Sequence, residues 1–309
     1  MKRFKSRKKR KFIKYLIIIF IIYLSFKCTF LYINRGINIE KYIKNLLNDG
    51  FNNQLNNNSI NLNDPINFIL YNLDLKYIDK ENNDKNSIKY VEQVNSSIKD
   101  PLIYIYNTHD SEEYKIDYKY EYSIIPNVKL ASYILQEKFL EENINAIVET
   151  KSIKEILNSN NWIYKDSYKA SRILLENIKN SNPSIKYYID IHRDSSNYDK
   201  TILEYNNKSY AKVLFIIGME NENFEYNLML ANNINKLLNE SIPGISKGIL
   251  KKEGIGVNGI YNQDFSNNLM LIEIGGVDNN IIEVSNTINV LGKVLSNYIR
   301  GEINEEKEI

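Results

Sequence analysis

Between residues 101 and 300, short apolar runs alternate with longer stretches in which apolar residues recur every three or four positions. The short runs are rich in Ile, Val and Tyr and predict strands at residues 102–106, 145–148, 185–191 and 269–274. The longer stretches predict amphipathic helices at residues 127–142, 152–158, 167–180, 224–238 and 280–298. This alternation predicts an α/β fold with a mostly parallel sheet flanked by helices.

Two further apolar runs, at residues 201–205 and 211–218, lie on either side of Asn206 and Asn207. Asn tolerates the backbone conformation that tight hairpin turns require, so we expect these two runs to pair as an antiparallel hairpin. The predicted sheet is therefore mixed.

The N-terminal part of the chain has a different pattern. Residues 2–11 contain eight Lys or Arg and no acidic residue, and residues 12–33 are apolar almost throughout. As a helix this apolar run spans about 33 Å, which is enough to cross a bilayer. We predict a transmembrane anchor at residues 12–34, with a basic cytoplasmic tail at residues 1–11 and the rest of the chain outside the membrane. A cleaved signal peptide is the weaker interpretation, because no small-x-small cleavage site is evident.

The residues between the anchor and the alternating region are rich in Asn and in charged side chains. Such segments bury little apolar surface, so we expect only a partly structured stalk at residues 35–100. We expect one folded domain at residues 101–300, followed by an acidic tail at residues 301–309.

Charge and cysteine content exclude two classes of function. The net charge of +2 depends on the basic tail, because the remainder of the chain has 32 basic and 38 acidic residues. This balance argues against nucleic-acid binding. The single cysteine, Cys28, excludes an internal disulfide and a zinc cluster held by thiolates.

The chain contains two histidines, and each follows a predicted strand. Polar residues at the ends of parallel strands meet at one edge of the sheet, where α/β folds place their sites. His109 and Glu112 have the spacing H-x-x-E, and together with His192 they make the kind of ligand set that holds a catalytic zinc. Glu121 is an alternative carboxylate ligand, since the spacing does not exclude it. Zinc lowers the pKa of a bound water and polarises a carbonyl, which suits hydrolysis of an amide.

Glu273 is the candidate for the group that takes a proton from the attacking water. It interrupts the apolar run LMLIEIGG, where an unpaired buried charge is costly and is usually explained by a cation, a metal or a proton-transfer role. A pairing of Glu273 with Arg193 is the structural alternative. Asp190 projects to the same face as His192 and is a candidate to orient its ring. Arg193 is expected to hold Asp194 or a substrate carboxylate.

Six ordered segments resemble the stage II sporulation protein P family of cell-wall hydrolases. They are IYNTHDSEEY at residues 105–114, YKASR at 168–172, DIHRDS at 190–195, PG at 243–244, YNQDFS at 261–266 and LIEIGG at 271–276. The resemblance implies the fold of zinc-dependent N-acetylmuramoyl-L-alanine amidases. It also implies zinc on His109 and His192 with a carboxylate, and Glu273 as the catalytic glutamate. One departure is Asn107, which stands where the family usually has the first histidine of HTH, and we expect the ligand to be the second, His109.

The resemblance further implies a peptidoglycan substrate, with endopeptidase activity on cross-links beside the amidase activity. It implies action at the sporulation septum during engulfment, with a lytic transglycosylase and a polytopic membrane protein as partners. Two other functions stay open at this point. One is a non-catalytic peptidoglycan-binding regulator with an amidase-like fold, and the other is a zinc carboxypeptidase.

Overall fold

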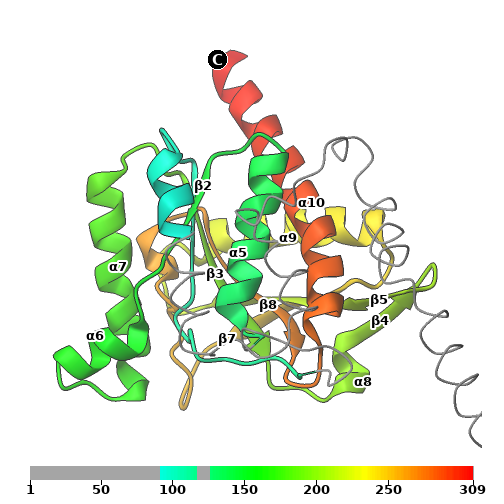
Figure 1. Ribbon diagram of the computed structural model, residues 1–309, viewed down its shortest axis with the longest axis horizontal. Helices are drawn as coiled ribbons and strands as arrows, with labels where there is room; N and C mark the ends of the chain where they lie inside the picture. Colours follow the sequence, from blue (N-terminus) through cyan, green and yellow to red (C-terminus); the bar gives the residue numbers. More distant parts are fainter. Residues whose placement is uncertain (1–90, 117–125, 309) are drawn as a thin grey trace, which may run out of the picture. The chain divides into compact units, whose positions relative to one another are not determined.

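The computed structural model describes residues 91–116 and 126–308, all within the second of two compact units, Ile60–Ile309 (Figure 1). The predicted basic tail, the anchor, most of the predicted stalk and Glu121 lie outside the described residues. None of the helices within the described ranges combines the length and the apolar character that a membrane crossing requires.

A six-stranded sheet forms the centre of the described unit. Its strand order is β2-β1-β3-β8-β6-β7, with β1 Ile103–Tyr106, β2 Ala146–Val148, β3 Tyr187–Asp194, β6 Val213–Gly218, β7 Ser246–Lys252 and β8 Leu269–Gly276. Neighbouring strands are parallel except for β6 and β8, which are antiparallel. The mixed, mostly parallel sheet flanked by helices that the sequence predicts is therefore confirmed.

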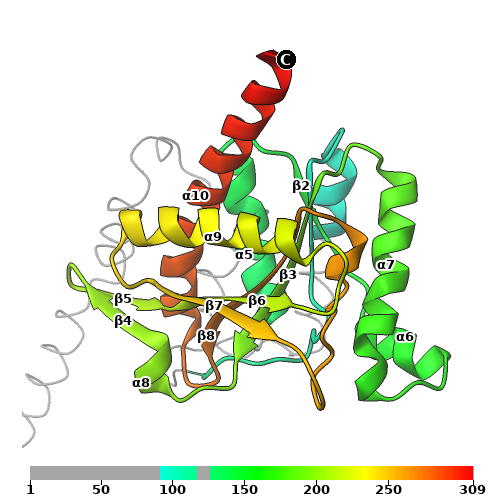
Figure 2. The same ribbon diagram turned by 180° about the vertical axis from the view of Figure 1, so that it is seen from behind.

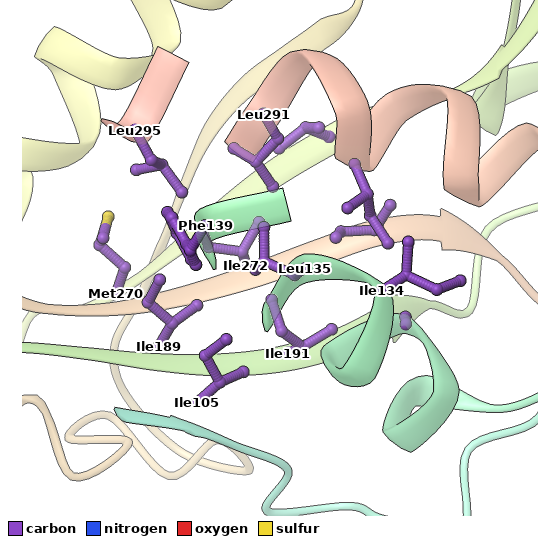
Figure 3. Close-up of a cluster of buried hydrophobic side chains, with 14 of the residues drawn as sticks. Ile105, Ile134, Leu135, Phe139, Ile189, Ile191, Met270, Ile272, Leu291 and Leu295 are labelled. Carbon is purple, nitrogen blue, oxygen red and sulfur yellow. The ribbon is translucent and has the colours of Figure 1, made fainter. Parts of the chain in front are cut away.

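Three helices pack on one face of the sheet: α5 (Val128–Glu141), α9 (Phe224–Ser241) and α10 (Ile281–Glu308). Figure 3 shows Leu135 and Phe139 of α5 beside Ile189 and Ile191 of β3. Leu291 and Leu295 of α10 extend the same apolar cluster, and α9 covers β6 and β7 (Figure 2). The fully buried Ile, Leu and Phe side chains of this layer make it the main core.

The opposite face is covered by α7 (Ser167–Ser181), with α6 (Ile153–Ser159) packed beside α7. Tyr104, Tyr106 and Tyr188 project from β1 and β3 towards Leu175 of α7. Two short 3-10 helices, η1 (Tyr164–Asp166) and η2 (Gln263–Phe265), flank this layer. This face is the less apolar of the two, because Asp190, His192 and Glu273 lie on it near the carboxyl ends of β3 and β8.

The predicted hairpin is right in its turn and wrong in its second strand. Asn206 and Asn207 have φ angles of 50° and 59° and join β4 (Ile202–Tyr205) to β5 (Lys208–Ala211). The apolar run that was expected to complete the hairpin is β6, which is buried along its whole length between β8 and β7. The physical reason is burial: β6 consists of VLFIIG and stabilises the core, whereas KSYA can close a half-exposed hairpin.

Three further elements differ from the prediction. Strand β7 was not predicted, because its sequence SKGILKK is that of a half-exposed edge strand. The short helix α8 (Tyr198–Thr201) was also not predicted. Helix α10 runs to Glu308, beyond the predicted helix end at residue 298, and so includes most of the acidic tail. Residues 91–97, which belong to the predicted stalk, are helical and pack on β2, since Asn95 hydrogen-bonds both the N–H (3.2 Å) and the C=O (2.7 Å) of Val148.

Candidate active site

The carboxyl ends of β1, β3 and β8 place the predicted site residues on one face of the sheet. His192 of β3 and Glu273 of β8 are register partners, so their side chains lie side by side. Asp190 stands two positions before His192 and therefore points to the same face. His109 lies in the turn directly after β1, and its ring centroid is 5.3 Å from that of His192. The two histidines of the chain thus meet at one place.

A tight turn explains the H-x-x-E spacing. The backbone N–H of Glu112 donates to the carbonyl of His109 at 3.0 Å, which brings both side chains to the same side. The carboxylate of Glu112 accepts a hydrogen bond from the Arg193 N–H at 3.0 Å. The same oxygen lies 3.5 Å from Nδ1 of His192. His109, Glu112 and His192 therefore form one cluster.

His192 lies between two carboxylates. Its Nε2 is 3.1 Å from Oδ1 of Asp190, although this contact lacks hydrogen-bond geometry. Burial lowers the pKa of His192, but Asp190 and Glu112 outweigh burial and raise the pKa to about 10. Burial would raise the pKa of Glu112, but the contacts with His192 and Arg193 leave it lower than usual. Burial and the neighbouring His192 lower the pKa of His109.

Glu273 has the properties of a proton acceptor near neutral pH. Burial, followed by the repulsion of Asp194, raises its pKa to about 7, and His192 partly offsets both effects. Within the described part of the chain, its carboxylate has no hydrogen-bond or ion-pair partner, so the alternative pairing with Arg193 is not formed. A carboxylate that is neither paired nor fully exposed is free to exchange a proton with a substrate or a water.

Asp194 is paired, but with a different cation from the one expected. Lys247 of β7 makes the ion pair with its carboxylate, and the Ser196 N–H donates to the same carboxylate at 2.7 Å. Arg193 makes only a 3.5 Å contact with the backbone carbonyl of Asp194, and its Nε is buried without a partner. Of the two roles expected of Arg193, the structure does not show the first, holding the Asp194 carboxylate, while the second, holding a substrate carboxylate, stays a prediction. A lysine that arrives from a strand 53 residues later in the chain leaves no local pattern in the sequence.

Three tyrosines that the sequence did not identify as site residues surround the histidines. Tyr164 of η1 stacks on His109 with centroids 4.7 Å apart. Tyr168 of α7 stands edge-on to His109 at 5.6 Å and stacks on His192 at 6.4 Å. Tyr261 packs edge-on against Tyr168 at 5.3 Å. Tyr168 and Tyr261 belong to YKASR and YNQDFS, two of the segments that resemble the family, but the sequence predicted no role for either tyrosine.

Asn107 points away from this cluster. Its side-chain amide donates to the carbonyls of Ile191 (2.8 Å) and Val128 (3.3 Å), and it accepts a hydrogen bond from Ser132 of α5 (3.1 Å). It is buried and joins β1, β3 and the start of α5. The residue at position 107 therefore has a structural role on the opposite side of the chain from His109.

The cluster fits a zinc ion in its donor types. Two imidazoles and one carboxylate are the ligands that catalytic zinc sites use, and Nδ1 of His109 is buried without a hydrogen-bond partner. Two ligands of a tetrahedral zinc, each about 2.0–2.1 Å from the metal, lie about 3.3 Å apart. The 3.5 Å separation of His192 and Glu112 is close to that value. Across the described ranges, no three His, Cys, Asp or Glu side chains already form a complete metal-holding group.

Comparison with known proteins identifies the family. Residues 36–296 match the family model of Stage II sporulation protein P (SpoIIP). The chain belongs to this family. It is 35% identical over 201 residues to the Stage II sporulation protein P of Bacillus subtilis (strain 168), which covers 63% of this chain and 50% of that protein. The chain thus matches about half the length of this curated relative.

Two solved structures have a loosely similar fold. Cwp6 from Clostridium difficile has a TM-score of 0.41 and 13% identity, over 64% of this chain and 29% of that one. The CwlD amidase from Clostridioides difficile, solved in complex with the GerS lipoprotein, has a TM-score of 0.40 and 13% identity, over 63% of this chain and 98% of that one.

Proposed function

We propose that this chain is a zinc-dependent peptidoglycan hydrolase of sporulation that cleaves the amide between N-acetylmuramic acid and L-alanine. The observation that carries the proposal is the register of β3 and β8, which sets Glu273 beside the cluster of His109, Glu112 and His192. Membership of the stage II sporulation protein P family supports the biological setting.

His109, Glu112 and His192 would hold the zinc, with Glu121 as the alternative carboxylate. When bound, zinc would polarise the scissile carbonyl and make a water acidic enough to lose its proton near neutral pH. Asp190, at 3.1 Å from Nε2 of His192, keeps the ring in place from the buried side.

Glu273 moves the proton in this proposal. Its pKa is about 7 in the metal-free protein, and the charge of a bound zinc would lower it, so the carboxylate would be deprotonated near neutral pH and could accept a proton from the attacking water. The same carboxylic acid can then donate that proton to the L-alanine nitrogen as the amide bond breaks. Glu273 thus returns to its starting state after each turnover, and no other proton acceptor is required.

The setting of the reaction is also part of the proposal. We place the domain outside the membrane, held by the anchor at residues 12–34, at the sporulation septum. A lytic transglycosylase and a polytopic membrane protein are the proposed partners, and cross-linked stem peptides are a proposed second substrate for endopeptidase activity.

The test is digestion of purified peptidoglycan by the purified chain, with mass analysis of the products and measurement of bound zinc. We expect free L-alanine amino groups on released stem peptides and about one zinc per chain. His109→Ala and His192→Ala should lose both zinc and cleavage, whereas Glu273→Gln should keep zinc and lose cleavage. Glu113→Gln is the matched control, because this neighbouring acid does not belong to the cluster.

Other products would replace the proposal with one of its alternatives. Release of single C-terminal amino acids would indicate a zinc carboxypeptidase. Binding of peptidoglycan with no zinc and no new chain ends would indicate a non-catalytic regulator.

A further inference from the structure

Two segments with no assigned role in the proposed chemistry, residues 168–172 on α7 and residues 261–266 around η2, contact each other beside the site. Arg172 makes two hydrogen bonds to the carboxylate of Asp264, at 2.8 and 2.9 Å. Asn262 donates to the carbonyl of Tyr168 and to the hydroxyl of Ser171, both at 2.9 Å. The first contact is half-exposed, whereas Ser171 is fully buried.

The buried contact continues towards His192. The Ser171 hydroxyl lies 2.9 Å from the hydroxyl of Thr108, and the Thr108 hydroxyl lies 2.6 Å from Oδ2 of Asp190. The Thr108 N–H donates to Oδ1 of Asp190 at 2.9 Å, so one residue holds both carboxylate oxygens. Oδ1 is also the atom 3.1 Å from Nε2 of His192. A hydrogen-bonded chain therefore runs from Asn262 to Asp190, whose Oδ1 lies beside the His192 ring.

The direction of this chain follows from its two ends. The side-chain nitrogen of Asn262 can only donate, and the carboxylate of Asp190 can only accept. A hydroxyl has one proton, so Thr108 gives its proton to Asp190 and its oxygen accepts from Ser171. Ser171 accepts from Asn262, and its own proton has two acceptors within reach, the Thr108 hydroxyl at 2.9 Å and the carbonyl of Tyr168 at 3.2 Å, of which Thr108 is the nearer. With that choice the hydrogen bonds of the chain run towards Asp190, and such a chain strengthens its members cooperatively in a buried site.

We infer that Thr108 and Ser171 are positioning residues, which hold Asp190 in the orientation that sets the His192 ring, and that Asn262 anchors this chain from the second segment. Thr108, Ser171 and Asp190 are fully buried, so no water competes for these bonds. The inference gives the two motif segments a role in the site, and it rests on the proposed function only in treating His192 as a functional group.

The structure supplies a control for the test. Ser171 and Arg172 are sequence neighbours that bind the same partner segment, but only Ser171 belongs to the polar chain. Ser171→Ala and Arg172→Gln each remove a contact between the two segments. A merely structural role would make both variants behave alike.

The first readout is the nuclear magnetic resonance spectrum of metal-free full-length protein in detergent, labelled only at histidine. The chain has two histidines, so two ring systems are observed, and His109→Gln tells them apart. We expect Thr108→Val and Ser171→Ala to shift the ring resonances of His192, with the larger shift for Thr108→Val. Thr108→Ser, which keeps the hydroxyl, should restore the spectrum of the parent. Arg172→Gln should lower the melting temperature and leave His192 unchanged.

The second readout is zinc affinity by competition with a chelator. Partners of ligating histidines typically contribute about 10–100-fold in metal affinity, so we expect a loss of about tenfold for Thr108→Val and about threefold for Ser171→Ala. Unchanged His192 resonances in both variants, or equal shifts in Arg172→Gln, would overturn the inference. Neither readout requires hydrolysis, so a chain that responds as expected but does not cut peptidoglycan would refute the proposed function and leave this inference standing.

Discussion

Replacing Glu273 with Gln should make the metal-free protein more stable at alkaline pH while it abolishes turnover. In the unfolded chain Glu273 loses its proton near pH 4.5, but in the folded protein it holds the proton up to about pH 7 because burial and Asp194 disfavour the charge. Between these two values the folded state binds more protons, so its stability falls as the pH rises. A glutamine side chain cannot ionise, so the variant does not lose this stability.

The size of the effect follows from the two pKa values. The pKa of Glu273 is about 7 in the folded state and about 4.5 in the unfolded state. This difference lowers the free energy of unfolding by about 3.4 kcal/mol once the group is ionised in both states. Between about pH 5 and about pH 8, about 2.5 kcal/mol of this decrease develops. The free energy of unfolding of the parent, relative to Glu273→Gln, should therefore fall by about 2.5 kcal/mol over this range.

Chemical denaturation of the chelator-treated protein at both pH values measures this difference. Glu113→Gln serves as the control, since it removes a neighbouring acid outside the cluster. A parent-minus-variant difference that stays constant between the two pH values would refute the argument that Glu273 is partly buried and unpaired. For activity, loss of a general base costs about 10²–10⁴-fold in turnover, and full activity of Glu273→Gln would remove it from the mechanism.

Three further predictions concern the site and the buried residues packed around it. Zinc affinity should rise about tenfold per pH unit below about pH 10, because the His192 imidazolium, with a pKa of about 10, must lose a proton before it can bind the metal. Competition titrations with a chelator at several pH values measure this slope. An affinity that does not change with pH would contradict the prediction. Asn107→His should lower the free energy of unfolding by about 1–3 kcal/mol, because it breaks buried hydrogen bonds to Ile191 and Ser132, without raising zinc stoichiometry in metal analysis. Gly275→Ala should destabilise by more than about 1 kcal/mol in thermal unfolding, since Gly275 has a φ of 66° and a Cβ there would lie 2.9 Å from that of Ala211.

The sequence was sufficient for the elements that have a strong local pattern. The helix predicted at residues 127–142 is α5, Val128–Glu141, and the structure shows it capped by the Asn127 side chain, which accepts from the Leu130 N–H at 2.9 Å. The strands that contain His192 and Glu273 were predicted from short apolar runs, one followed by His192 and the other interrupted by Glu273. The second strand of the hairpin was wrong because β5 and β6 are separated only by Lys212, and local pattern cannot tell which of them leaves for the central sheet.

Residue types and their order along the chain determined the fold class, the family and the meeting of two histidines at one sheet edge. His109 follows β1 and His192 lies near the carboxyl end of β3, and neighbouring parallel strands end at the same edge, so their proximity required no knowledge of distant contacts. Tertiary structure alone decided which neighbours each site residue has: Lys247 rather than Arg193 beside Asp194, Tyr168 against both rings, and the chain from Asn262 to Asp190. These contacts join strands and helices that are far apart in sequence, and their partners are selected by strand order and register, which short-range patterns do not encode.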